Sequence, residues 1–148
     1  TIPHTYMVVT TDLVDNLKDI HPSYKWIIAQ RLAQQALQVE YGKMNNESFS
    51  PKFRAAKRKG NQLVISFDQL PNGFRDLTTD SLNWFSIADK NGIFLPASAR
   101  INGLNVIVSN TSVRKPKYIR FAWNEKAMPN LFSKEGLPVI PFRNDSFK

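Results

Sequence analysis

Only one long stretch of this chain has apolar residues at the spacing of a helix. Short segments in which apolar and polar residues alternate follow it, so the fold must combine one helix with several short strands. Between Ser23 and Tyr41 apolar residues recur at spacings of three and four, the period of an amphipathic helix. The apolar face comprises Trp26, Ala29, Ala33, Ala36 and Leu37, with Ile28 and Leu32 beside it. Gly42 is a typical stop signal. We expect this helix to pack its apolar face on a sheet.

The residues before the helix complete a strand-loop-helix pattern. Residues 6–11 form a β-branched run that ends at polar Asp12, which predicts a buried strand feeding a βα unit. The loop that follows carries Asp19 and His21. In open α/β sheets, ligands bind beyond the carboxyl ends of the strands, so this loop is where a site is expected.

Beyond Gly42 the period changes. Residues 43–51 form a polar connector, which predicts a boundary between a domain at 1–44 and a second at 45–148. Short strands follow, predicted at 53–59, 62–68, 82–88, 93–95, 97–101, 105–109 and 117–123. Gly60-Asn61 and Asn102-Gly103 are hairpin signals. This spacing predicts an antiparallel β-sandwich, with residues 130–143 lying along a surface rather than in a central strand.

Composition excludes several classes of protein. The chain has no cysteine, so disulfide scaffolds, thiolate metal sites and cysteine nucleophiles are excluded. No apolar run approaches about 20 residues and no signal-peptide pattern is present. The net charge of +8 suggests an acidic partner, but its densest cluster, Lys52 to Lys59, alternates with apolar residues and favours a solvated sheet face over a phosphate-binding patch.

The residues with the clearest chemistry are Asp19-Ile20-His21-Pro22. Pro22 suits the first turn of a helix and places His21 at its N-terminus. The positive end of the helix favours the neutral imidazole, which can act as a base. A carboxylate at Asp19 can orient the ring and stabilise its cation. The alternative is that His21 is an ordinary capping or loop residue, which is the commoner role for a histidine before a proline.

The chain resembles the C-terminal end of sialate O-acetylesterases and related SGNH-type carbohydrate acetylesterases. The two most specific motifs are Asp19-Ile20-His21-Pro22 and the closing Glu135-Gly136-Leu137-Pro138. Further matching segments, in family order, lie at 2–5, 8–13, 31–33, 41–42, 85–89, 119–123, 130–131 and 141–143.

The resemblance implies a serine esterase that removes O-acetyl groups from sugars, such as sialic acid or related glycans, without metal or cofactor. His21 matches the catalytic base of the family, and Asp19 is the nearest group to orient it. The implied partners are an acetylated carbohydrate and the N-terminal portion of the same enzyme, with neither nucleic acid nor membrane. The implied compartment is secreted, periplasmic or lysosomal. The fold would be the terminal unit of an SGNH-type α/β hydrolase followed by the sandwich.

Two departures from the family pattern leave questions open. The position three residues before His21, where the general SGNH pattern has aspartate, is Lys18. Asp19, Asp15 or a backbone carbonyl therefore remain candidates to orient the ring. None of the six glycines begins a Gly-x-Ser sequence, so the nucleophile is missing and this chain alone should not hydrolyse esters.

A second reading makes the sandwich a carbohydrate-binding or domain-packing module without catalysis. The aromatic candidates for sugar stacking are Trp84, Phe85, Trp123 and Phe132, although each is more typical of a core or interdomain contact. A third reading, nucleic-acid binding through the net charge, predicts binding that falls steeply with salt.

Overall fold

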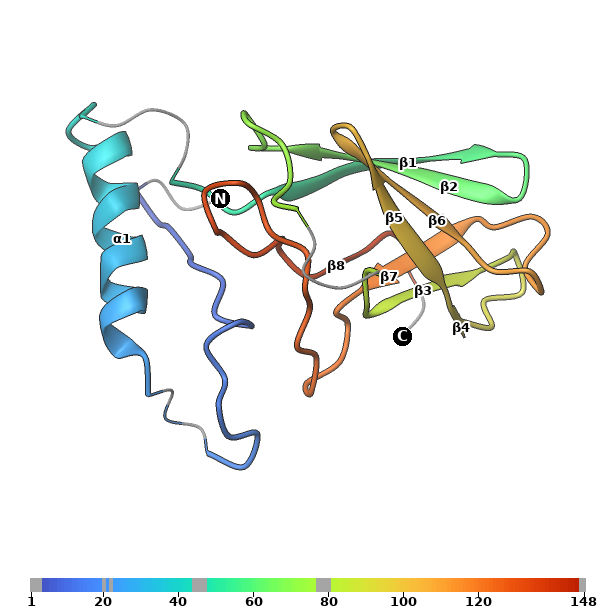
Figure 1. The fold of residues 1–148 in the computed structure, drawn as a ribbon, viewed down its shortest axis with the longest axis horizontal. Coiled ribbons are helices and arrows are strands. Elements are labelled where there is room, and N and C mark those ends of the chain that lie inside the picture. The colour runs from blue at the N-terminus through green and yellow to red at the C-terminus, as the bar shows by residue number, and fades with distance from the viewer. Residues whose placement is uncertain (1–3, 20, 22, 44–47, 77–80, 147–148) are drawn as a thin grey trace.

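The fold combines one helix with two β-sheets. The structure is a computed structural model, and it describes residues 4–19, 21, 23–43, 48–76 and 81–146. The elements in chain order are α1 (Lys25–Val39), β1 (Lys52–Lys59), β2 (Gln62–Asp68), β3 (Phe85–Ala88), β4 (Leu95–Pro96), β5 (Ser98–Asn102), β6 (Asn105–Ser109), β7 (Tyr118–Phe121) and β8 (Phe142–Arg143). Figure 1 shows α1 and the residues before it at one end of the molecule and the strands at the other.

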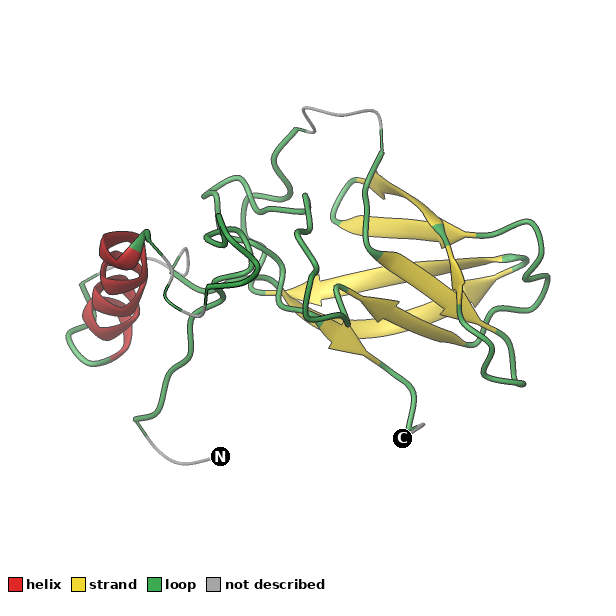
Figure 2. Cartoon of the chain, turned by 90° about the horizontal axis from the view of Figure 1, so that it is seen from below, coloured by secondary structure: helices red, strands yellow, loops and turns green. Residues whose placement is uncertain are grey.

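The strands form two four-stranded antiparallel sheets. One has the order β1-β2-β6-β5 and the other the order β4-β3-β7-β8. Figure 2 shows the two sheets as one strand-rich body that lies apart from α1. This arrangement agrees with the antiparallel β-sandwich that the strand spacing predicts.

A single apolar core lies between the sheets. Along β2 the buried side chains are Leu63, Ile65 and Phe67, which alternate with partly exposed ones, as period-two strands with one buried face require. The facing sheet contributes Ile119 and Phe121, both with no exposed surface. The rings of Phe53, Phe85, Phe121 and Phe142 pack in a chain with centroid distances between 4.5 and 5.5 Å. These contacts hold the two sheets together.

The hairpin turns follow glycine. The Gly60-Asn61 loop joins β1 to β2 as predicted, with Gly60 at a φ of 63°. The next hairpin differs from the prediction, because Asn102 pairs with Asn105 and the loop is Gly103-Leu104. Gly103 has a φ of 60°, and glycine at the first loop position is typical of a type II′ turn.

Two predicted strands are shorter than expected for the same backbone reason. The strand predicted at 82–88 begins only at Phe85, and the one predicted at 117–123 ends at Phe121. Trp84 and Ala122, next to those ends, have φ values of 60° and 49°. A left-handed backbone does not continue a pleated strand. The Ala122 N–H donates to the Trp84 carbonyl at 2.9 Å, so the two residues close the sheet together.

The C-terminal tail is part of the core, which corrects the prediction of a surface path. Leu131 and Val139 have no exposed surface, and Phe142 is 7% exposed. β8 pairs with β7 at the edge of its sheet. The core therefore includes residues near the end of the chain. Their apolar side chains are buried although prolines interrupt the segment, because burial of apolar surface is favourable.

α1 is two residues shorter at each end than predicted. Its N-cap is Tyr24, which makes no side-chain capping bond. At the other end Gly42 has a φ of 59°, and the Lys43 N–H donates to the Leu37 carbonyl at 3.0 Å. This bond spans six residues and closes the end of the helix, and the left-handed backbone at Gly42 ends the helical path. No helix in the described part of the chain is long and apolar enough to cross a membrane.

α1 is turned the opposite way from the prediction. Its buried residues are Arg31 and Gln35, whereas Trp26 is 67% exposed and Leu37 is 39% exposed. We call the apolar face formed by Trp26, Ala29, Ala33, Ala36 and Leu37 the α1 stripe. The helix buries polar side chains against residues 7–12, and the α1 stripe has no sheet against it in the described residues.

Residues 6–11 are not a strand in the structure, contrary to the prediction. Among the described residues no strand lies beside them, and a central strand of a parallel sheet needs neighbours on both edges. Side chains of α1, and not neighbouring strands, bond the backbone of this segment. Arg31 donates to the Val9 carbonyl and Gln35 to the Met7 carbonyl. The segment runs next to the helix in Figure 1.

Candidate active site

Arg31 fixes the segment that leads into the candidate site. Its side chain is 8% exposed, and its guanidinium forms two bonds with the Asp12 carboxylate, at 2.6 and 2.9 Å. The same group donates to the Val9 carbonyl at 2.6 Å. Paired bonds of this kind are among the stronger and more directional ones in proteins. Arg31 therefore holds residues 9–12 against α1, and from there the chain runs through the loop to His21.

The loop after Asp12 is folded by short-range hydrogen bonds. The Asn16 side chain accepts the Lys18 N–H at 3.0 Å, and the Asn16 carbonyl accepts the Asp19 N–H at 3.1 Å. The Asp19 carboxylate then accepts the His21 N–H at 2.9 Å. Asn and Asp favour turns because their side chains bond the backbone two residues on. The sequence of this loop thus brings Asp19 and His21 together locally.

The Asp19 carboxylate also contacts the His21 ring. Its Oδ1 lies 3.1 Å from Nδ1 of His21. An ionised carboxylate only accepts hydrogen bonds, so this contact suits the tautomer of the neutral ring in which Nδ1 donates and Nε2 is the acceptor. The His21 side chain is 74% exposed and that of Asp19 is 51% exposed. The ring is open to another segment or to a substrate.

The predicted position of His21 at the helix N-terminus is wrong. α1 begins at Lys25 after the N-cap Tyr24, so His21 precedes the helix by more than a residue. The Asp19 carboxylate satisfies the His21 N–H in a local turn, and such side-chain bonds compete with helix formation. Pro22, on which the prediction also rested, lies outside the described residues.

A small acidic pocket lies beside the pair. Its volume is about 260 Å³, and its lining includes Asp15, Asp19 and Glu125. Glu125 comes from the segment after β7, so the pocket lies between the loop and the sandwich. Of the two carboxylates proposed to orient His21, Asp19 makes the hydrogen bond to the ring, and Asp15 lines the pocket.

A second histidine-carboxylate pair lies at the other end of α1, and sequence reasoning missed it. His4 Nδ1 is 2.9 Å from Glu40 Oε1, and Tyr6 donates its hydroxyl to the same oxygen. The hydrogen bond to Glu40 raises the pKa of His4. Bonds from Tyr6, and then from His4, lower the pKa of Glu40. His4 and Glu40 are 36 residues apart, so no local motif pointed to the pair.

The aromatic candidates for sugar stacking divide into two groups. Trp84, Phe85 and Trp123 line a common pocket of about 420 Å³, where Trp84 and Trp123 are 40% and 53% exposed and Phe85 belongs to the core. Phe132 is not in that pocket, and its ring lies 4.5 Å from the Arg75 guanidinium. No group of three or more histidine or acidic residues suited to a metal ion was found in the described ranges.

Comparison with known proteins relates the chain to a solved enzyme structure. No protein-family model and no curated protein matches the chain. Among solved structures, it matches the crystal structure of a novel carbohydrate acetylesterase from Xanthomonas citri, with a TM-score of 0.85 and 34% sequence identity. The chain is thus similar to part of a carbohydrate acetylesterase. The match covers 92% of this chain and 31% of the esterase chain, so it spans about a third of that protein.

Proposed function

We propose that this chain is the C-terminal part of a serine esterase that removes O-acetyl groups from sugars, sialic acid or related glycans among them. The similarity to a carbohydrate acetylesterase over 92% of the chain carries the proposal. In it, residues 1–44 complete the SGNH catalytic domain, residues 45–148 form the sandwich domain, and the enzyme acts in a secreted, periplasmic or lysosomal compartment. The N-terminal portion of the enzyme supplies the serine.

His21 acts as the general base in this proposal. Nε2 takes the proton of the serine hydroxyl as its oxygen attacks the acetyl carbon. The imidazolium then gives that proton to the sugar oxygen as the ester bond breaks, which leaves an acetyl-serine. Water, deprotonated in turn by Nε2, releases acetate and restores the serine. Asp19, which bonds Nδ1 at 3.1 Å, holds the ring and stabilises its cation.

The α1 stripe is the surface that the N-terminal portion covers. Exposed Trp26 and Leu37 are large side chains, and apolar surface of this kind gains free energy when it is buried. Two buried side-chain oxygens, Thr11 Oγ1 and Gln35 Oε1, have no hydrogen-bond partner in the described residues. Buried polar atoms are normally paired. Both observations favour a neighbouring polypeptide at this end of the molecule.

The decisive experiment combines the chain with an N-terminal portion that carries a Gly-x-Ser motif, and measures acetyl-ester hydrolysis. We expect His21→Ala to lower kcat by roughly 10³-fold or more, with partial rescue by added imidazole. His4→Ala is a matched control, because His4 also pairs with a carboxylate and is 76% exposed against 74% for His21. Full activity of His21→Ala, or equal loss with His4→Ala, would overturn the assignment.

The orienting group is tested in the same assembly. Asp19→Asn should lower kcat by roughly 10-fold or more while leaving KM unchanged, because it weakens a bond to the cationic ring. Asp15→Asn, from the same pocket, serves as the comparison. A larger loss with Asp15→Asn would give that carboxylate the orienting role.

Assembly through the α1 stripe has its own test. Trp26→Glu should weaken association with the N-terminal portion at least about tenfold, because it places a charge in an apolar contact. Ile93→Glu is the control, since Ile93 is 70% exposed and lies on the sandwich. Size-exclusion chromatography and titration calorimetry measure the association. Equal effects of the two substitutions would contradict the assigned interface.

A further inference from the structure

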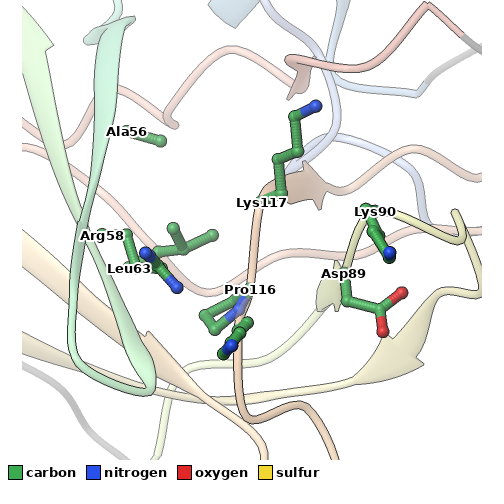
Figure 3. Close-up of a pocket in the computed structure, with 8 residues that line it drawn as sticks. Ala56, Arg58, Leu63, Asp89, Lys90, Pro116 and Lys117 are labelled. Atoms are coloured by element: carbon green, nitrogen blue, oxygen red, sulfur yellow. The ribbon is translucent and has the colours of Figure 1, made fainter.

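A basic pocket lies between the β1–β2 hairpin and the residues that follow β3 and precede β7. Figure 1 shows this hairpin reaching the end of the molecule away from α1. Its volume is about 490 Å³, and its lining comes from one sheet and from loops next to strands of the other. Figure 3 shows Ala56, Arg58 and Leu63 on one side, Asp89 and Lys90 on the other, and Pro116 between them. Lys115 and Lys117 complete the lining. Four cations therefore face a single carboxylate.

These cations have no acidic partner in the described part of the chain. Arg58, Lys90, Lys115 and Lys117 form none of the ion pairs found there, whereas Arg31, Arg120 and Arg143 all do. Asp89 is occupied by its own turn, where its oxygens accept the backbone N–H and the side-chain amide of Asn91 at 2.8 and 3.4 Å. The ammonium of Lys117 lies 5.0 Å from the Tyr118 ring. Arg58, Lys90 and Lys115 remain available to an anion.

Arg58 points into the pocket because of the strand register. It pairs with Leu63 across the β1–β2 hairpin, and Ala56 pairs with Ile65. Leu63 and Ile65 are core residues, so Ala56 and Arg58 lie on the inner face of the sandwich. Lys57 and Lys59 alternate to the outer face. A cation thus stands at the mouth of an apolar core.

The floor of the pocket is apolar. Leu63 and Pro116 are almost fully buried, and Ala56 packs against the core. Such a floor suits the C–H face of a sugar ring, while the cations suit a carboxylate or sulfate on that sugar. The lining contains no aromatic ring on which a nucleic-acid base could stack. This combination favours an acidic saccharide over a nucleic acid.

We propose that this pocket binds an acidic saccharide, with Arg58, Lys90 and Lys115 contacting its anionic group. That the ligand is a sugar rests on the proposed function, whereas the cations of the pocket are the evidence that it is anionic. The site would hold an acidic glycan at a distance from His21, so that the sandwich contributes to substrate recruitment. A purely structural alternative is that Arg58 protects the edge strand β1 from pairing with other molecules, as inward-pointing charges do.

Binding is tested on the 148-residue chain by titration calorimetry and NMR, which need neither the serine nor His21. The probes are trigalacturonate, its methyl ester as an uncharged match, and a sulfated heparin disaccharide, which separates sulfate from carboxylate recognition. We expect binding of one or both acidic probes and none of the ester, with weakening between about 50 and about 300 mM salt. Absence of binding to both acidic probes would overturn the proposal.

Charge variants localise the site. Arg58→Ala with Lys115→Ala should reduce affinity at least about tenfold, whereas Lys57→Ala with Lys59→Ala, which removes the same charge from the outer face, should leave it within about twofold. Equal losses would mean diffuse attraction and would overturn the pocket. Tighter binding of single-stranded DNA, lost in the same variant, would replace the saccharide by nucleic acid.

Arg58→Glu separates recognition from edge protection. Glutamate still places a charge at the inner face, so the chain should stay monomeric in either case. If Arg58 contacts the saccharide, the Arg58→Glu substitution should abolish saccharide binding. Unchanged affinity would make Arg58 an edge-protecting residue and contradict its place in the site. His21→Ala should bind normally, so inactivity of the assembled esterase and failure of this pocket are distinguishable.

Discussion

The two ends of this molecule treat their apolar residues in opposite ways. In the sandwich, Ile65, Ile119 and Phe121 have no exposed surface and face one another across two sheets. On α1, the buried residues are Arg31 and Gln35, while Trp26 is 67% exposed. The two buried side-chain oxygens that lack partners among the described residues, on Thr11 and Gln35, also belong to the α1 end.

The difference shows that the sandwich contains its own packing partners, whereas the part of the chain that the structure describes offers none to the α1 stripe. An apolar face is buried only where the chain supplies a complementary surface. β8, from the end of the chain, completes the second sheet, whereas the hydrogen bonds that α1 makes to the segment before it go to backbone carbonyls and to Asp12. The helix therefore presents to that segment the side chains that can bond those groups. The contrast is open to direct tests.

The largest effect should come from the sandwich core. Phe121→Ala removes a fully buried ring that packs on Phe85 and Phe142, and it should lower the free energy of unfolding by about 3–5 kcal/mol. Leu37→Ala on α1 is the counterpart, expected to cost under about 0.5 kcal/mol because Leu37 is 39% exposed and alanine is a strong helix former. Urea unfolding followed by tryptophan fluorescence measures both. Comparable costs would contradict the contrast between the two ends.

A smaller and local effect is expected at the polar contact of α1. Arg31→Ala leaves the largely buried Asp12 carboxylate without its partner, a change that costs about 3 kcal/mol when a pair is well buried. Amide hydrogen exchange should rise by roughly 10² over residues 7–12 and stay unchanged in β2 and β6. Arg54→Ala is the control, because its pair with Asp68 is 3.6 Å long and more than half exposed. Protection that survives in Arg31→Ala would show that other contacts hold this segment.

The smallest effect is a pH dependence where His4 meets Glu40. The pKa of His4 is raised from 6.5. The stability that protonated His4 contributes is therefore fully present below that value and is lost as pH rises through the raised pKa. The pKa of Glu40 is lowered from 4.5. The stability that ionised Glu40 contributes is therefore present above that value and is lost as pH falls through the lowered pKa. The contact should therefore be strongest between about pH 4.5 and 6.5.

NMR titration of the His4 ring checks this dependence. Glu40→Gln should return the pKa of His4 toward its ordinary value, because the hydrogen bond to Glu40 is the main cause of the shift. Tyr6→Phe keeps that partner and should leave the pKa of His4 raised. An unchanged pKa in Glu40→Gln would mean that this pair does not form in solution.

Sequence reasoning succeeded where the signal is short in range. β2 and β6 match their predicted bounds, because alternation and a glycine turn define a hairpin within a few residues. It failed at Trp84 and Ala122, whose left-handed backbones end two strands early. The Ala122 N–H donates to the Trp84 carbonyl, and these two residues are far apart in the chain. No local sequence pattern predicts such a contact.

The same division applies to the candidate site. The sequence by itself determined that Asp19 would lie near His21, because two residues in one turn cannot be far apart. The tertiary structure alone decided which face of α1 is buried and that the C-terminal tail joins the core. An amphipathic pattern specifies two faces of a helix, but burial depends on the surfaces that the rest of the chain brings to them.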